Sequence, residues 1–274
     1  MKTKSLNAIL YASLTVVAIV NIFPIFWMIS SAFKVPTELY TSEIRLIPHQ
    51  PTLENFWIPL FEYDVSMWFL NSVVTTLGIS VFQVVVSLLA AFALSYYTTR
   101  FNEAVFYCII VTMVIPFQVT MVPNYILISR MRLINTWAAV ILPSIPAATT
   151  FFFLRQHVRS IPRVLFEVAR IEGARSPWTL IHVVFGLCKG AISAMFILCV
   201  IESWNLYFWP LLVLNKPETR TLPIGLQQFM DHEAGNRVGP FMATATLASL
   251  PIIALFICIQ RNIIEAFVTA GIKG

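Results

Sequence analysis

Long apolar runs constrain the fold of this chain more than any other feature of its sequence. Six runs with few charges lie near residues 8–33, 68–96, 104–127, 136–154, 180–214 and 240–260. A helix needs about 20 apolar residues to cross a bilayer. The longest piece outside these runs, Lys34 to Met67, is shorter than the roughly 50 residues of the smallest independent domains. We therefore predict an all-α, polytopic membrane protein with six transmembrane helices, in which residues 1–274 form a single domain.

The composition supports this class of protein and argues against others. Hydrophobic residues make up 58% of the chain, charged residues only 11%, and the mean hydropathy is +0.79. The net charge of +5 does not indicate nucleic-acid binding, because the basic residues lie in short loops between spans. No CxxC pair and no zinc-ligand spacing is present, so we expect neither disulfides nor a metal site. The cysteines concerned are Cys108, Cys188, Cys199 and Cys258.

The distribution of lysine and arginine predicts the orientation of the spans. With the N-terminus in the cytoplasm, eleven of the 18 basic residues fall on the cytoplasmic side and seven outside. Cytoplasmic loops carry such an excess, although Arg130 and Arg132 run against it. We expect a multi-pass protein of the cell (inner) membrane with both termini cytoplasmic and outer loops at 34–67 and 215–239.

Prolines and one very long run predict irregular spans. Bilayer helices tolerate proline when neighbours cover the freed backbone groups, so kinked helices are expected. The run 180–214 exceeds a simple crossing, which predicts a tilt or a break at Pro210. The prolines inside other runs are Pro116, Pro123, Pro143, Pro146 and Pro251.

The first run has an alternative interpretation as a cleavable signal peptide. Lys2 and Lys4 precede it, and the small residues Ser30, Ser31 and Ala32 follow it. Its apolar stretch of about 22 residues is longer than the roughly 7 to 15 of a signal peptide. An uncleaved first span is therefore favoured.

The loop at 155–178, between the fourth and fifth runs, has the pattern of a short helix outside the bilayer. Pro162 fits its first turn, Ser160 or Ile161 its start, and Gly173 its C-terminal end. Its charged residues are spaced so that they lie on one face of the helix, and its apolar residues must pack against another surface. Such a helix usually rests on the protein's own helix ends or on lipid headgroups.

This loop carries the motif through which the chain resembles a known family. Glu167 and Ala169, followed by Gly173, are similar to the Glu-Ala-Ala and glycine core of the inner-membrane permeases of binding-protein-dependent ABC importers. Matches continue in order over nearly the whole chain, at Asn71-Ser72, Ile115-Pro116, Val122-Pro123, Trp204-Asn205, Trp209-Pro210-Leu211, Thr221-Leu222-Pro223 and from Gln260-Arg261 to Gly274. The set resembles the carbohydrate-uptake branch, close to the second permease of maltose-type and glycerol-phosphate-type systems. It implies the type I ABC importer permease fold.

The chain departs from the family pattern at three places. Val168 replaces the second alanine, and Glu172 stands where the family usually has aspartate. The stretch Val183 to Gly186 replaces Ile-x-Leu-Pro, so the turn after the helix lacks its proline. Because of these departures, the family resemblance does not determine how rigidly this loop is held.

The resemblance implies an ATPase-coupling role for the loop helix, which in the family inserts into a cleft of the ATPase subunit. The coupling residues would be Glu167, Ala169, Arg170, Glu172 and Gly173. Small residues permit close approach, a carboxylate offers a partner for a basic group, and Val164 with Phe166 offers apolar anchoring. The chain has no GxxxxGK[ST] sequence, so we expect no cofactor of its own. ATP and Mg would bind to the partner ATPase.

The resemblance also implies the partners. They are a homologous second permease, two ATPase subunits and an extracytoplasmic substrate-binding protein that docks on the outer loops. The lipid membrane surrounds the spans, and nucleic acid is not expected. The outer loops alternatively serve only to cap the helix ends.

Glu202 is the one acidic residue that the sequence places inside a run, and an intramembrane acid is a functional candidate by default. We expect it to line a substrate path with Trp204, Asn205 and Tyr207, because hydroxyl-rich solutes need hydrogen-bonding groups and aromatic faces. A lining carboxylate favours neutral or cationic solutes over phosphate esters. The alternative places Glu202 near the outer end of a tilted helix, paired or solvated.

The predicted function is that of a permease subunit, not an enzyme, that imports a sugar, oligosaccharide or polyol. A first alternative is the same importer class with glycerol 3-phosphate or a related phosphodiester as substrate. A second is an ion-coupled secondary transporter, which a single intramembrane acid and the lack of a visible repeat disfavour. An intramembrane enzyme is disfavoured because HExxH, GxSxG and paired carboxylates within spans are missing.

Overall fold

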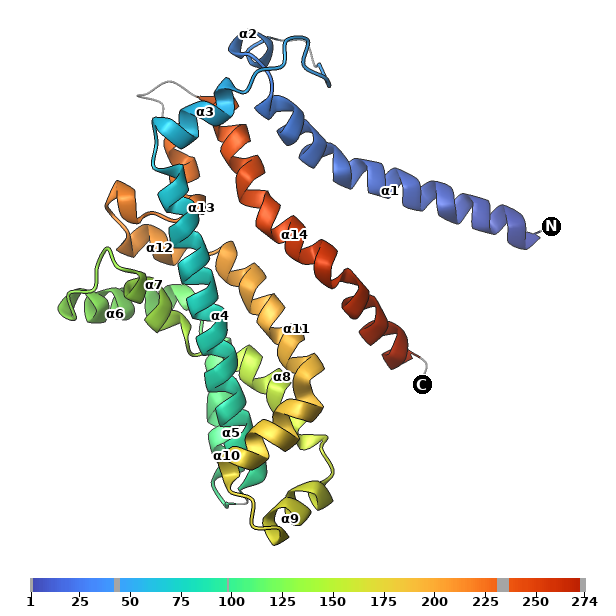
Figure 1. The fold of residues 1–274 in the computed structure, drawn as a ribbon, viewed down its shortest axis with the longest axis vertical. Helices are drawn as coiled ribbons and strands as arrows, with labels where there is room; N and C mark the ends of the chain where they lie inside the picture. The colour runs from blue at the N-terminus through green and yellow to red at the C-terminus, as the bar shows by residue number, and fades with distance from the viewer. Residues whose placement is uncertain (1, 42–44, 98, 231–236, 272–274) are drawn as a thin grey trace. The chain divides into compact units, whose positions relative to one another are not determined.

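The computed structural model describes residues 2–41, 45–97, 99–230 and 237–271. These ranges contain helices and turns but no strand, which confirms the all-α prediction (Figure 1). The chain forms two compact units, one of residues 1–66 with 222–264 and the other built on residues 67–221. The single domain expected from the sequence stays a prediction.

Four single helices in the described part of the chain are long and apolar enough to cross a membrane, and two bent helix pairs raise the number to as many as six. The single spans are Ile9–Ala32 in α1 (Lys2–Ala32), Val65–Tyr96, which is α4, Ser176–Trp204, and Val238–Cys258 in α14 (Val238–Gly271). Pro24 and Pro251 lie inside α1 and α14 without ending either helix.

The third expected span is not one continuous helix. α5 (Asn102–Val111) and the 3-10 turn Thr112–Val114 are followed by α6 (Phe117–Arg130) at an angle of 99°. Pro116 lies at the break, and Ile115 before it is extended, with φ −75° and ψ 115°. Proline disfavours helical geometry in the residue before it and lacks an N–H of its own. The kink expected from the prolines of the run at 104–127 is present at Pro116, where it is sharp enough to separate two helices.

The fourth expected span is also bent, by 50°, between α7 (Trp137–Ser144) and α8 (Ala148–Arg159), with Pro146 between them. The fifth begins with α10 (Ser176–Thr179) and a π-helical turn, Leu180–Val184. It continues as α11 (Phe185–Trp204).

The long apolar run at 180–214, which contains α11, breaks before Pro210 rather than at it. α12 (Phe208–Val213) follows α11 after Asn205–Tyr207, and Pro210 lies in the first turn of α12. Proline costs nothing there, because the first N–H groups of a helix have no partner within it. The expected break at Pro210 is therefore moved to residues 205–207.

The unit built on residues 67–221 has an apolar core between α4, α5, α8 and α11. α11 packs on α8, and α8 packs on α5. Figure 1 shows the loop helix at the end of this unit, beyond α5 and α10. The core residues are Val84, Leu88, Ala91, Phe92, Phe106, Phe151, Leu154, Val158, Ile161, Val184, Cys188, Ile192, Met195 and Cys199.

In the other unit, the segment after α1 folds back on the helix end. It contains α2 (Pro36–Leu39) and α3 (Glu54–Phe61). Asn55 Nδ2 donates to the carbonyl oxygens of Ala32 at 3.0 Å and Lys34 at 2.7 Å. This buried amide satisfies the Ala32 carbonyl, which the end of α1 leaves unpaired, and the Lys34 carbonyl that follows the helix. The short helix α13 (Leu222–Gly225) and a 3-10 turn, Leu226–Met230, also belong to this unit.

Candidate functional site

The loop helix is α9, Arg163–Ile171, and it begins after Ser160 and Ile161, the two starts expected from the sequence. Pro162 is not in its first turn but precedes it as the N-cap, with φ −56° and ψ 129°. Ser160 ends α8, where its N–H bonds to the carbonyl of Gln156. The chain thus turns from one helix into the next over three residues, and the proline directs the backbone out of the helical region.

The C-terminal end of α9 is where the sequence predicts it, at Gly173. This glycine has φ +77°, a conformation that costs other residues about 1–2 kcal/mol. Its N–H donates to Arg170 O at 3.1 Å, and the N–H of Ala174 donates to Ala169 O at 2.9 Å. These two bonds form a Schellman motif, which satisfies the last carbonyls of the helix.

α9 has one face turned to its own chain and one face exposed. Ala169 is 5% exposed, and the Phe166 ring meets the Tyr96 ring edge-on at 5.6 Å between centroids. The inward position of Phe166 removes it from the set expected to anchor a partner. The exposed apolar face, called the docking face below, consists of Val164, Leu165, Val168 and Ile171.

Polar coupling candidates lie beside the docking face. Glu167, Arg170 and Glu172 are all exposed, and Glu172 is the C-cap of α9. A β-carbon at Gly173 would meet no atom within 4 Å. Within this chain the glycine is therefore required by its backbone conformation and not by a close neighbour.

Arg155 holds the end of α8 against α5, a role that was not predicted from the sequence. The residue is 1% exposed, and its guanidinium lies 3.9 Å from the centre of the Phe106 ring. Nη2 donates to Glu103 Oε1 at 3.1 Å. A sequence signal for this burial exists, because Phe151 and Val158 flank Arg155 at helical spacing and both are buried.

The four path candidates do not gather on one surface. Glu202 is exposed in the last turn of α11, and Asn205, the C-cap, is exposed with Nδ2 donating to Ile201 O at 2.7 Å. Trp204 is buried instead, with its ring edge-on to Phe69 at 5.8 Å between centroids. Tyr207 is half-buried, with its ring edge-on to that of Phe208. Glu202 and Asn205 share the exposed end of α11, whereas Trp204 packs α11 on α4.

Two asparagines fix the segment that follows α12. Asn71 Nδ2 donates to Glu218 O and Arg220 O, both at 2.9 Å, and its Oδ1 accepts from Trp137 Nε1 at 2.8 Å. Asn135, with φ +64°, accepts from the Asn215 N–H at 2.6 Å through its Oδ1. In the sequence, Asn71 stands out only through the family resemblance.

Metal ligands do not gather in the described ranges, since no three His, Cys, Asp or Glu side chains meet as a metal site there. Cys188 and Cys199 are buried within the apolar core, and Cys199 Sγ lies 3.5 Å from Thr150 Oγ1. Both pack in the core as small, largely apolar side chains.

The candidate spans and the exposed docking face of α9 describe a multi-span membrane protein with an apolar surface outside its spans. Residues 83–267 match the family described as binding-protein-dependent transport system inner membrane component. The chain belongs to this family, and the resemblance seen in its sequence is confirmed. It is a permease subunit of an ABC importer.

Relatives of the chain align over most of their length. The arabinooligosaccharides transport system permease protein AraQ of Halalkalibacterium halodurans is 33% identical over 280 residues, which cover 100% of both chains. The sn-glycerol-3-phosphate transport system permease protein UgpE of Brucella abortus is 30% identical and covers 91% of this chain and 92% of its own. A chain from the crystal structure of a bacterial ABC transporter involved in the import of the acidic polysaccharide alginate superposes with a TM-score of 0.84. It is 20% identical, and the match covers 95% of this chain and 98% of that one, which establishes a shared fold.

Proposed function

We propose that this permease, paired with a homologous second permease, forms the membrane path for a neutral sugar, oligosaccharide or polyol. A soluble binding protein delivers the solute to the outer loops, and both termini lie in the cytoplasm. The relatives named above transport arabinooligosaccharides and sn-glycerol 3-phosphate, which supports a small hydroxylated solute.

The uncovered docking face of α9 is the observation that carries the proposal, because it supports an importer in which an ATPase subunit binds α9 and drives transport. Ile171 is 85% exposed and Val164 63%, although the helix lies outside every candidate span. Apolar side chains of this size gain about 1.5–3 kcal/mol each when they are fully buried. An ATPase subunit that covers this face would gain that energy and would transmit its closure to α8 and α11 through α9. No resident cofactor is required in this chain, since ATP and Mg bind to that ATPase.

The coupling residues divide between recognition and support. Glu167 and Arg170 are exposed beside the docking face and would meet charges on the ATPase. Ala169, which is buried, seats α9 on its own subunit, and Gly173 with the C-cap Glu172 ends the helix.

Glycerol 3-phosphate is the second candidate substrate, and the UgpE relative is the observation that favours it. Glu202 favours the neutral sugar, because an exposed carboxylate at the end of α11 repels a phosphate ester.

Uptake measurements test the proposal. Cells that express the transporter with its binding protein would be given labelled arabinooligosaccharides, a disaccharide or glycerol 3-phosphate in turn. We expect uptake of one neutral glycan, abolished by ATP depletion and kept when the ion gradient alone is collapsed. Uptake that follows the ion gradient would overturn the importer mechanism, and uptake of glycerol 3-phosphate alone would select the second candidate.

A further inference from the structure

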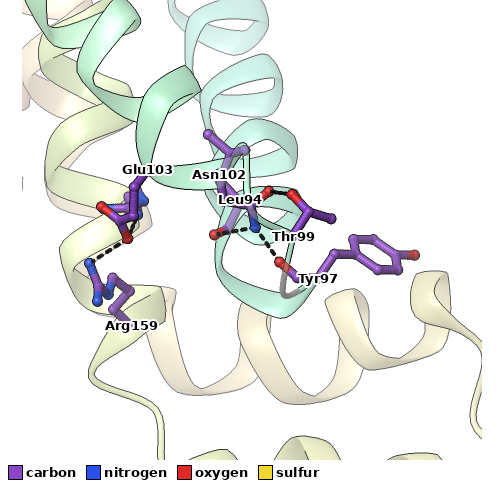
Figure 2. Close-up of polar contacts among 7 residues, drawn as sticks. Leu94, Tyr97, Thr99, Asn102, Glu103 and Arg159 are labelled. Atoms are coloured by element: carbon purple, nitrogen blue, oxygen red, sulfur yellow. Dashed lines mark hydrogen bonds and ion pairs between the residues drawn. The ribbon is translucent and has the colours of Figure 1, made fainter.

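A polar cavity of about 280 Å³ lies among the ends of α4, α5 and α8 and the start of α9, and nothing in the proposed transport path uses it. Its charged lining residues are Glu103, Arg155, Arg159 and Arg163, three guanidinium groups against one carboxylate. Figure 2 shows Glu103 reaching across to Arg159. The cavity therefore carries an excess of positive charge at its wall.

Arg155 is incompletely paired although it is almost fully buried. Glu103 Oε1 accepts from Nη2, but Nε and Nη1 have no hydrogen-bond partner among the described residues. The Ser95 hydroxyl on the same wall is also buried and unpartnered within the described ranges. Buried donors without acceptors are costly, and a buried cation is more so. An acceptor that carries negative charge would satisfy these donors and balance the excess of arginines at the wall.

Glu103 shows that an anionic oxygen fits at this wall. One of its oxygens lies 3.1 Å from Arg155 Nη2 and 3.5 Å from Arg159 Nη1. Glu103 is 56% exposed, so it sits at the rim, and its single charge leaves the three arginines in excess.

We propose that this cavity binds a phosphate group. Arginine is the side chain best suited to phosphate, because its planar, always charged guanidinium donates several hydrogen bonds to phosphate oxygens. Arg155 and Arg159 come from α8 and Arg163 from α9, so a bound phosphate would tie the start of α9 to the end of α8. The phosphate belongs either to an anionic phospholipid headgroup or to free phosphate, and the chemistry of recognition is the same.

Binding to the assembled transporter tests the proposal and separates the two sources. The transporter would be placed in nanodiscs of phosphatidylcholine, with or without phosphatidylglycerol. Native mass spectrometry would count the phosphatidylglycerol that stays bound, and equilibrium dialysis would measure labelled inorganic phosphate in the discs without phosphatidylglycerol. We expect saturable binding of at least one probe, and the probe that binds identifies the source.

Matched variants make the test specific. Arg159→Gln removes an exposed arginine of the cavity, and the binding of that probe should fall about tenfold or more, as for a lost charged hydrogen bond. Ser95→Asp places a carboxylate against the same wall and should displace the probe as well. Arg100→Gln makes the same charge change outside the cavity and should bind like the parent. The absence of saturable binding for both probes, or an equal loss in Arg100→Gln and Arg159→Gln, would overturn the proposal.

Discussion

Gly173 adopts a backbone conformation that limits which residues can replace it. With φ +77° and open space where a β-carbon would lie, alanine is opposed by its backbone preference and not by a neighbour in this chain. Asparagine tolerates the left-handed region better than alanine does. The structure therefore separates a backbone role for Gly173 from a role in close approach to a partner.

We predict that Gly173→Asn retains more transport than Gly173→Ala, although asparagine is larger. The alanine variant should lose about 1–2 kcal/mol of the stability of the helix end. Uptake per assembled complex, with ATP hydrolysis recorded in parallel, measures the effect. If Asn is the worse replacement, close approach of the ATPase at Gly173 dominates.

Glu38 is a second residue whose local contacts have a measurable consequence. Burial by itself would raise the pKa of this carboxyl. Hydrogen bonds from the backbone N–H groups of Gln50 and His49 lower the pKa, as do the charges of His49 and Arg45. These causes outweigh burial, so the pKa of Glu38 lies below its ordinary value. The two N–H groups lie 3.0 and 3.1 Å from the carboxylate oxygens. The ionised carboxylate thus holds the segment that follows α2.

A lowered pKa fixes the sign of the pH dependence. The contribution of Glu38 is fully present above the ordinary carboxyl pKa and is lost as the pH falls through the lower, folded value. We predict that the midpoint of thermal unfolding of the parent exceeds that of Glu38→Gln at pH 7 and that the difference shrinks below pH of about 4. Glu54→Gln serves as the charge-matched control. A difference that stays constant with pH would refute the assignment.

At the scale of elements, the sequence predicts where the candidate spans lie along the chain but not the directions of their helix axes. The apolar runs locate all the candidate spans, because insertion into a bilayer depends on local hydropathy. The same runs say nothing about the direction of an axis. Pro116 gives a local signal for the kink in the third run, but neither its angle of 99° nor the break at 205–207 follows from hydropathy.

The candidate site shows the same division. Gly173 and the helix before it are predicted correctly, because a glycine stop is a local signal. The inward turn of Phe166 and the burial of Arg155 are not predicted, since both follow from contacts with segments distant in the sequence, through Tyr96 and Phe106. A basic residue near a span end indicates orientation first, and only the apolar neighbours Phe151 and Val158 at helical spacing indicate that Arg155 is also packed.

The docking face of α9 yields a prediction at the same scale. Val168→Ser with Ile171→Ser removes two exposed apolar side chains, and the chain should still fold because neither belongs to its core. We expect the amount of ATPase that copurifies to fall at least about tenfold, since each lost side chain is worth more than about 1.4 kcal/mol if buried in the complex. Phe101→Ser is the control, since Phe101 is 75% exposed at the start of α5. Equal copurification of all three proteins would remove α9 from the interface.

At the scale of the whole molecule, the chain leaves much apolar surface without cover of its own. In the apolar stretch of 18 residues that qualifies α1 as a candidate span, no residue is buried within the chain. In the corresponding stretch of α4, only 39% of the residues are buried. Such surfaces require an apolar environment such as a lipid bilayer, because exposed apolar area of this extent is not stable in water. An assembly of several subunits in a membrane satisfies this requirement.

The orientation of that assembly is predicted by the basic residues and can be tested by labelling. Single cysteines at Glu54 and Arg163, which are both exposed, would be placed in a background without the four native cysteines. In intact cells an impermeant thiol reagent should label position 54 and not position 163, and lysis should make both reactive. Labelling at position 163 from outside would reject the topology with both termini in the cytoplasm.

The transport path gives the last prediction, which concerns Glu202 and Asn205 at the exposed end of α11. An acid at the centre of a span costs about 2.5–3.5 kcal/mol on insertion scales. Glu202 lies in the last turn of α11, where this cost is smaller, and its exposed carboxylate can accept hydrogen bonds from a hydroxylated solute. Glu202→Gln keeps the shape and removes the charge, so a neutral sugar should still pass, with a changed apparent affinity or rate. Glu202→Leu combined with Asn205→Leu removes the hydrogen-bonding groups and should reduce uptake much more severely.

The matched comparison is Trp204→Phe. Trp204 lies in the same turn of α11 as Glu202, but it is buried against Phe69 of α4 and is not exposed as Glu202 and Asn205 are. This substitution should alter stability more than the affinity for the solute. Uptake per assembled complex and ATP hydrolysis stimulated by the binding protein would be measured together, so that a failure of the path is distinguished from a failure of coupling. A path defect lowers uptake while the stimulated hydrolysis persists. If the double-leucine variant transports like the parent, the pair contacts lipid or another subunit, and the path is formed by the other spans or by the second permease.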